Sequence, residues 1–366
     1  MKNLIFAIIF GSLLPVGSKL TAQVNPDSTS VLDTLPKIKK LTVSGYVDAY
    51  YGYHFQNPKP HSAEYFYSSA ISNEFSVNLA YVDLNYTSSN LKARFIPAVG
   101  TYMESNYAVE RPIFRNVYQA TGSVRLFKDI WLEAGVLPSP FGYETAISKD
   151  QLTYSRSFSA ENSPYYLAGA RLGIPISGKV SLSVYAINGW QNINETNKSK
   201  SFATQVQYKI NNHLLLNWSS YLGNEQTVDS LKASYRFFND CYLFFNKGKW
   251  SVVALFDIGR QNVNDTIWVW HTANLKARYN ITPKLALAGR AEYYSDPHSV
   301  IITPISPTKG FEVYGFSANI DYAPASDVLL RLEGRSLTAK NPVFMKENQT
   351  FSKSAFTLIA SLTVSF

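Results

Sequence analysis

Residues 355–366 read AFTLIASLTVSF, and this stretch decides the fold class of the chain. In an extended segment, one face would carry Phe356, Leu358, Ala360, Leu362, Val364 and Phe366. The opposite face would carry Thr357, Ser361, Thr363 and Ser365, with Ile359 as the one exception. Alternation with a period of two indicates a β-strand with one apolar and one polar face. The length is close to the roughly ten residues with which a tilted strand crosses a membrane.

The same alternation recurs along the chain after residue 40, for example in 180–190, 250–259 and 314–322. We predict sixteen strands, over 41–54, 75–86, 91–101, 116–127, 130–138, 165–175, 179–190, 201–210, 213–222, 237–246, 249–260, 266–280, 283–295, 311–323, 326–338 and 355–366. Segment 75–86 changes parity midway, so we expect a β-bulge there.

The connections between these strands alternate in length. Short ones such as 87–90, 177–178 and 247–248 separate long ones such as 102–115 and 139–164. Some external links, such as 191–200 and 261–265, are shorter. Outer-membrane barrels have tight periplasmic turns and long external loops. We therefore predict an all-β fold, a transmembrane antiparallel up-and-down β-barrel of about sixteen strands over residues 41–366.

The composition favours a membrane barrel over a soluble protein. Only 16% of the residues are charged, and 25 Tyr, 22 Phe and 6 Trp need a large apolar surface. From residue 41 onward, no apolar stretch is long enough for a membrane helix. The net charge of +8 comes from dispersed basic residues, so we expect no nucleic-acid partner. The single cysteine, Cys241, excludes an internal disulfide and lies on an apolar strand face.

The amino terminus has the features of a secretory signal. Met1, Lys2 and Asn3 form a basic start, residues 4–16 are apolar, and 17–23 offer small residues for cleavage. We predict a signal peptide over 1–22, cleaved after Ala22, and a periplasmic lead-in over 23–40.

Charged residues fall on the polar face of most strands, which points into the lumen of a membrane barrel. The inward set has ten basic and eight acidic members: Asp48, Asp83, Lys92, Arg94, Arg125, Glu133, Arg171, Lys209, Asp240, Asp257, Lys276, Arg278, Arg290, Glu292, Asp321, Arg331, Glu333 and Arg335. They must meet water or pair across the lumen, because buried unpaired charges cost several kcal/mol each. Most such residues in wide barrels hold the wall in shape, and the slight basic excess favours a weak anion preference.

The longest connection, 139–164, reads SPFGYETAISKDQLTYSRSFSAENSP and is the third external loop. Its charged residues, Glu144, Lys149, Asp150, Arg156 and Glu161, are candidates for a constriction. The loop either folds into the lumen and narrows it or caps the mouth, and the sequence does not choose between these arrangements.

Three parts of this region, GVLPSPFGYE, YSRSF and NSPYYLAGARLGIP, resemble the OmpL-like branch of the β-barrel porin family of Bacteroidetes-type bacteria. The opening SGYVDAYYGYHFQNP and the late WSVVALFDIGRQ are similar too, so the resemblance covers about residues 41–366. It implies an outer-membrane location in a Gram-negative bacterium and porin-like permeation, including ion transport. It carries over no catalytic or ligand residues.

We therefore expect a porin that forms a water-filled channel for small hydrophilic solutes. The alternatives are a channel specific for a sugar or an apolar compound, and a non-conducting structural or adhesin barrel. Inward aromatic residues, among them Tyr46, Tyr50 and Trp131, leave room for a stacked sugar.

We expect no enzyme, because the five histidines are dispersed. Their spacing indicates no catalytic, cofactor or metal site. Expected partners are outer-membrane lipids, small hydrophilic solutes and the outer-membrane assembly machinery, for which the closing strand and Phe366 would be the signal. A homotrimer is a candidate assembly, although the strand faces show no evident contact patch.

Overall fold

The structure is a computed structural model that describes residues 40–58, 61–227 and 231–366. The predicted signal peptide and lead-in lie outside the described residues, apart from Lys40, the first residue of β1.

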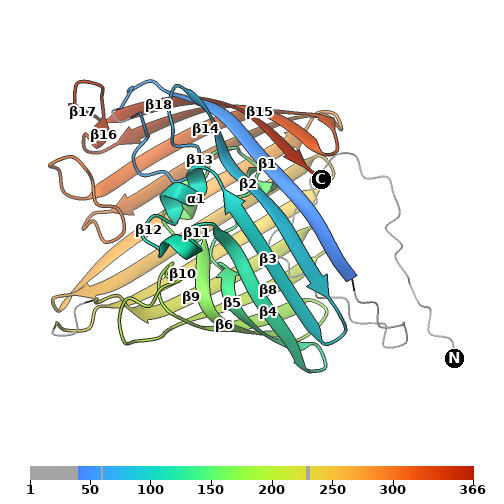
Figure 1. The fold of residues 1–366 in the computed structure, drawn as a ribbon. Coiled ribbons are helices and arrows are strands. Elements are labelled where there is room, and N and C mark those ends of the chain that lie inside the picture. Colours follow the sequence, from blue (N-terminus) through green and yellow to red (C-terminus); the bar gives the residue numbers. More distant parts are fainter. Residues whose placement is uncertain (1–39, 59–60, 228–230) are drawn as a thin grey trace.

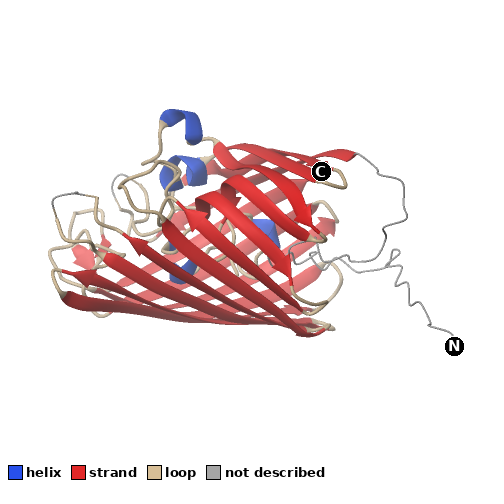
Figure 2. Cartoon of the chain, turned by 90° about the horizontal axis from the view of Figure 1, so that it is seen from below, coloured by secondary structure: helices blue, strands red, loops and turns tan. Residues whose placement is uncertain are grey.

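Sixteen strands form one closed antiparallel barrel, in which each strand pairs with its neighbour in sequence and β18 closes onto β1 (Figures 1 and 2). They are β1 (Lys40–His54), β2 (Glu74–Thr87), β3 (Leu91–Val99), β4 (Val117–Phe127), β5 (Ile130–Pro138), β6 (Tyr166–Pro175), β7 (Val180–Ile187), β8 (Ser201–Asn211), β9 (Leu214–Asn224), β10 (Tyr235–Lys247), β11 (Trp250–Val263), β12 (Thr266–Asn280), β13 (Leu285–Asp296), β14 (Phe311–Ala325), β15 (Val328–Ala339) and β18 (Ser354–Ser365). The predicted fold class and strand number are confirmed.

Short elements occupy several of the connections. They are α1 (Thr101–Asn106), η1 (Pro112–Phe114), η2 (Ser148–Asp150), α2 (Phe158–Glu161) and a small hairpin of β16 (Phe344–Met345) and β17 (Phe351–Ser352). None of the helices in the described ranges is long and apolar enough to cross a bilayer. The sequence predicts only loop or strand end for these segments, because such short elements have no periodic signal of their own.

The predicted bulge is present in β2. Asp48 of β1 pairs with Leu79, whereas the next residue, Ala49, pairs with Val77, so Asn78 is the extra residue. The Asn78 side chain turns inward and its Nδ2 donates to Asp48 Oδ2 at 2.9 Å. The bulge therefore reverses the parity of β2 and gives Asp48 a buried partner.

One predicted connection is shorter than expected. β11 and β12 pair as far as Val263 and Thr266, which leaves only Asn264 and Asp265 between them. These residues have φ values of 49° and 64°, as the central residues of a type I′ turn require. Asn and Asp tolerate this conformation, so the link 261–265 tightens into a two-residue turn and the strands lengthen.

The two faces of the barrel are inverted relative to a soluble protein. On β14, outward-facing Phe316 is 63% exposed, while inward-facing Asp321 is 1% exposed. An apolar exterior and a polar interior are what a hydrocarbon environment requires of a closed sheet.

The last residue of the sequence, Phe366, extends the pairing between β18 and β1. Gly45 N donates to Phe366 O at 2.7 Å, and Phe366 N donates to Gly45 O at 3.0 Å. The phenyl ring lies over Gly45, where a Cβ would overlap it, and the side chain is 77% exposed. The role of Phe366 as an assembly signal remains a prediction.

Inside the barrel, Gly259 makes room for the Trp270 ring. A Cβ at position 259 would overlap the indole, which is itself buried and stacks on Phe238 at 6.2 Å.

We expect Gly259→Val to destabilise the barrel by about 1–3 kcal/mol through overpacking, measured as a lower midpoint of urea unfolding in detergent. Gly334→Val is the control, because a Cβ there meets only the Phe356 ring, at an ordinary contact distance of 3.6 Å. Equal midpoints for the two variants would contradict this prediction.

Candidate functional site

Residues 139–164 fold into the lumen and cross it from one wall to the other. Near the start of the loop, the Pro140 carbonyl accepts hydrogen bonds from Gln205 of β8 at 3.3 Å and Ser219 of β9 at 2.8 Å. Further along, Ser148 Oγ donates to Asp48 Oδ2 of β1 at 2.8 Å. Most of the side chains between these points are buried. Of the two arrangements that the sequence left open, the structure has the inward fold.

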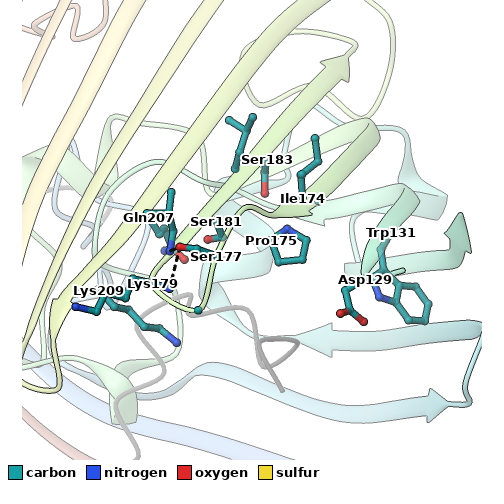
Figure 3. Close-up of a pocket in the computed structure, with 14 residues that line it drawn as sticks. Asp129, Trp131, Ile174, Pro175, Ser177, Lys179, Ser181, Ser183, Gln207 and Lys209 are labelled. Carbon is teal, nitrogen blue, oxygen red and sulfur yellow. Dashed lines mark hydrogen bonds between the residues drawn. The ribbon is translucent and has the colours of Figure 1, made fainter. Parts of the chain in front are cut away.

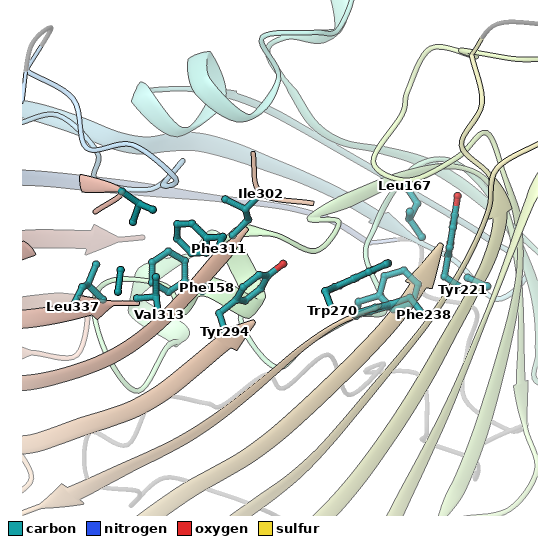
Figure 4. Close-up of a cluster of buried hydrophobic side chains, with 14 of the residues drawn as sticks. Phe158, Leu167, Tyr221, Phe238, Trp270, Tyr294, Ile302, Phe311, Val313 and Leu337 are labelled. Atoms are coloured by element: carbon teal, nitrogen blue, oxygen red, sulfur yellow. The ribbon is translucent and has the colours of Figure 1, made fainter. Parts of the chain in front are cut away.

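Aromatic side chains pack both ends of the loop against the wall, and Figure 4 shows Phe158 beside Phe311 and Tyr294. Phe141 packs edge-on against Phe238 of β10 at 5.5 Å. Phe158 of α2 packs against Phe311 of β14 at 5.4 Å and Tyr294 of β13 at 6.1 Å. The loop is therefore fixed by packing as well as by polar contacts.

The first predicted constriction residue, Glu144, forms a buried ion pair with the wall. Its Oε2 lies 2.6 Å from Lys276 Nζ of β12, and its Oε1 lies 4.0 Å from Arg290 Nη1 of β13. Burial alone would raise the pKa of Glu144, but Lys276 and Arg290 outweigh it and hold the pKa at about 2. This carboxylate stays ionised over the whole physiological range and holds the loop against β12 and β13.

The charges of β13 and β15 bind the backbone of the loop. Arg290 Nη1 donates to the Ser155 carbonyl at 2.6 Å, and Glu333 accepts from Ser155 N at 2.6 Å. Arg331 donates to the carbonyls of residues 148 and 151, both at 2.6 Å. Glu292 accepts from the amide of residue 158 at 2.8 Å and from Arg335 at 2.6 Å. These side chains are buried, and their contacts are structural.

Two more of the predicted constriction residues hold loops in place. Arg156 donates to the Thr145 carbonyl at 2.6 Å and the Ala146 carbonyl at 2.7 Å, which folds the loop back on itself. Glu161 accepts from the amides of Tyr67 at 2.8 Å and Ser68 at 3.3 Å. It thereby ties this loop to the first external loop. Neither side chain is open to the lumen.

The remaining two loop candidates, Lys149 and Asp150, lie at the loop tip and are only partly buried. Lys149 contacts Ser365 of β18. Burial raises the pKa of Asp150 to about 6, against the opposing effect of Lys149, Arg331 and Arg156. Ala146 and Ile147, just before the tip, pack in one cluster with Tyr81 of β2 and Tyr118 of β4, so this part of the loop faces the wall formed by β2 to β4.

The wall opposite the loop carries the more exposed lumenal charges. Arg94 of β3 pairs with Asp83 of β2 at 2.7 Å, and Arg171 of β6 pairs with Glu133 of β5 at 2.7 Å. The Arg94 side chain remains 41% exposed. Lys92 and Arg125 flank the Trp131 ring, at 3.9 and 5.3 Å from its centroid. Asp257 does not belong to these more exposed charges. It is buried on β11, where it pairs in register with Asp240 of β10.

Three inward tyrosines, Tyr46, Tyr81 and Tyr118, line this side. Tyr81 stacks between Tyr46 and Tyr118, with ring centroids 5.2 and 6.1 Å away. Of these, only Tyr46 is among the inward aromatic residues that the sequence predicts. The register across β1, β2 and β4 brings them together, and no local pattern indicates that register.

Glu161 makes the contact between the loop 139–164 and the first external loop sensitive to pH. Burial raises its pKa to about 7, against the opposing amides of Tyr67 and Ser68 and the charges of Arg156 and Arg335. An acid whose folded pKa lies above its unfolded value of about 4.3 loses stability as pH rises between the two values. The contact between the two loops is therefore stronger at pH 5 than at pH 8.

We predict that brief openings of the loop, recorded as current fluctuations in a planar bilayer, are rarer at pH 5 than at pH 8. Glu161→Gln should remove most of this dependence, because its side chain does not titrate. Asp150→Asn is the matched control for the other titrating carboxyl of the loop. A pH dependence that is unchanged in Glu161→Gln would refute the assignment.

The comparisons with known proteins agree with the geometry. Solved structures with the same fold include OmpT, an outer-membrane protein of Vibrio cholerae, with a TM-score of 0.59, 10% identity, and coverage of 91% of this chain and 99% of that one. The anion-selective porin from Comamonas acidovorans has a TM-score of 0.58 and 12% identity, covering 90% and 100%. OmpF of Salmonella typhi, in complex with daunomycin, has a TM-score of 0.59 and 9% identity, covering 90% and 100%.

At these identities the solved structures show the fold alone. A search of curated protein sequences finds no match. The family model described as "Putative beta-barrel porin-2, OmpL-like" matches residues 40–366, which is the entire barrel. The chain therefore belongs to this family and is a porin of the outer membrane.

Proposed function

We propose that this porin passes small hydrophilic solutes between the tip of the loop 139–164 and the wall formed by β2 to β6. One observation carries the proposal. Lys276, Arg290, Arg331 and Arg335 of β12, β13 and β15 are buried in the lumen, whereas the side chains of Arg94 on β3 and Arg171 on β6 remain 41% and 18% exposed. Water and solutes therefore meet the second group.

A weak anion preference follows from the same wall. Arg94 and Arg171 are each paired with one carboxylate, whereas Arg125 lies 5.3 Å from the uncharged Trp131 ring. The local excess of positive charge favours anions over cations in a narrow aqueous passage. The anion-selective porin from Comamonas acidovorans has the same fold, which is consistent with this selectivity.

Planar-bilayer recording of the refolded protein tests the proposal. We expect stable ohmic conductance, and in a KCl gradient a reversal potential displaced toward that of chloride. Arg94→Gln combined with Arg125→Gln should shift the reversal potential toward that of potassium, whereas Lys284→Gln, on an exposed turn, should not. A barrel without conductance would refute the channel, and a cation-selective wild type would refute the preference.

The tyrosine stack favours a second candidate, a channel specific for sugars. Tyr81 and Tyr118 are half-buried and lie nearly parallel, at 12°, beside the part of the loop that leads to Lys149 and Asp150. Aromatic faces with neighbouring polar groups suit the apolar and hydroxyl sides of a sugar ring. Block of the ion current by a neutral oligosaccharide, lost in Tyr118→Ala, would support this candidate over general diffusion.

We also propose that the barrel assembles as a homotrimer through β3 to β7. These strands have 8 to 11 residues, whereas β10 to β15 have 12 to 15. A registered row of small outward residues crosses the short wall: Ala93, Gly122, Ala134, Ala170 and Ala186. A wall of short strands with small outward side chains suits contact with a neighbouring copy. OmpT is described in a trimer form. Native mass measurement should give three copies, and Gly122→Trp should give one.

A further inference from the structure

Two aspartates face each other inside the barrel on neighbouring strands. Asp240 of β10 and Asp257 of β11 pair directly in register, and they are 0% and 2% exposed. Their carboxyl groups lie within hydrogen-bond reach of each other. With both groups ionised, Asp240 Oδ2 and Asp257 Oδ1 have no hydrogen-bond donor. Because buried polar atoms are almost always hydrogen-bonded, this contact calls for a hydrogen between the two groups.

The positive charge near this pair is already in use. Among the cations, Lys276 of β12 acts most strongly on Asp257, but its Nζ lies 2.6 Å from the carboxylate of Glu144. On the other side, the row of the pair continues to Gln205 of β8, whereas Lys209 of that strand lies further along, at the small pocket between β5 and β8 (Figure 3). The other groups that act on the pair electrostatically carry no positive charge, and they are Cys241, Tyr242 and Tyr294.

One shared proton removes both difficulties. Two carboxylates in contact disfavour each other's charge, most of all where water is excluded. A carboxyl group that keeps its proton becomes a hydrogen-bond donor. It can donate to the facing carboxylate and leave the pair with a single negative charge.

The same pair is linked to the start of the loop that crosses the lumen. Asn217 of β9 donates through Nδ2 to Asp240 Oδ1 at 3.2 Å and to Ser219 Oγ at 3.1 Å. Ser219 Oγ in turn donates to the Pro140 carbonyl at 2.8 Å. The backbone of Gly142 is also close enough to interact with Asp240. A change in the charge of the pair therefore reaches the loop at the point where it enters the lumen.

We infer that Asp240 and Asp257 share one proton, and that this proton keeps the start of the loop in place and makes the channel sensitive to alkaline pH. Loss of the proton would leave two repelling charges on strands that backbone pairing holds together. The start of the loop is then the part that can move aside and admit water. Since the closed form is the one that binds the proton, its stability is present at low pH and is lost as pH rises. The inference rests on the proposed function, because the loop it controls belongs to the same channel.

Infrared spectroscopy of the refolded full chain in detergent tests the shared proton without any need for conduction. The background is Glu161→Gln, which removes the loop acid with a pKa of about 7. We expect a band of protonated carboxyl groups at pH 7 that is reduced when Asp257→Asn is added, because an amide at this position donates the hydrogen bond and does not titrate. Asp240→Asn should reduce the band in the same way, so the test stands if one variant does not fold. Asp265→Asn, at an exposed turn, is the matched control and should keep the band.

Current recording in a planar bilayer tests the effect on the loop. In the Glu161→Gln background, brief openings should become about threefold more frequent between pH 7 and pH 9. Adding Asp257→Asn should remove this rise, and adding Asp265→Asn should keep it. A barrel that does not conduct but shows the expected infrared changes would refute the proposed function and support the shared proton.

Two results would overturn the inference. The first is an infrared band that neither Asp257→Asn nor Asp240→Asn reduces, in a barrel that conducts normally. In that case a bound cation would replace the proton, and openings would depend on the concentration of Mg²⁺ or Ca²⁺ at constant pH. The second is a rise in openings with pH that Asp257→Asn leaves unchanged, which would separate the pair from the loop.

Discussion

Deletion of residues 145–160 is expected to raise the single-channel conductance of the refolded barrel several-fold. The deleted segment contains the buried core of the loop, including Ser148, Thr153 and Phe158, and fills the middle of the lumen. A barrel of sixteen strands is wide enough for an aqueous channel once its interior is cleared. The buried wall cations Arg290 and Arg331 would then be hydrated, which adds to the anion preference.

Deletion of residues 347–349 is the control for this experiment. They form the exposed tip between β16 and β17, outside the lumen, so their loss should leave conductance unchanged. Unchanged conductance after deletion of 145–160 would mean that the loop does not restrict permeation.

Substitution of Lys276 by Met is expected to release the loop without shortening it. Glu144 would remain buried, with Arg290 4.0 Å away as its nearest positive charge. Removing one partner of a buried pair typically costs about 3–5 kcal/mol, because the other charge is left uncompensated. We expect a higher and noisier conductance and faster cleavage of the loop by an added protease, with the barrel itself still folded.

The double variant Lys276→Met with Glu144→Gln should recover most of the wild-type behaviour, because it removes the stranded charge. Acid resistance provides an independent check. In the wild type, the pKa of about 2 means that the contribution of Glu144 to stability is present above about pH 4.3 and is lost only as pH falls toward 2. In Lys276→Met, protonation would neutralise the stranded Glu144 carboxylate, so lowering the pH should restore loop order in the variant over a range in which the wild type does not change. Wild-type conductance in the single variant would contradict the role of this pair.

The strands and turns of this barrel follow from local patterns. Period-two alternation places side chains such as Phe316 and Asp321 on opposite faces, and the loop lengths place the tight turns at one end. Even the bulge at Asn78 was detectable as a change of parity in 75–86. The link at Asn264 and Asp265 was predicted too long, because the strands can extend to a two-residue turn without any change in their alternation.

The functions of the inward charges could not be predicted in the same way. The alternation of each strand indicates that Arg94 and Arg290 both face the lumen. It does not distinguish a residue that meets water, such as Arg94, from one that binds the loop, such as Arg290. Arg290 contacts Ser155, 135 residues away, and Glu144 contacts Lys276, 132 residues away. Contacts at such separations depend on how the barrel closes and where the loop lies within it.

The alternating segment 355–366 was sufficient to identify a membrane strand, because the side-chain period of a strand is a local property of the backbone. It could not indicate that its last residue lies over Gly45, nor that the lumen behind it contains the loop tip with Lys149. Both features arise only when β18 meets β1 and the barrel closes. Closure brings together groups from distant parts of the chain and determines which of the inward charges remain open to water.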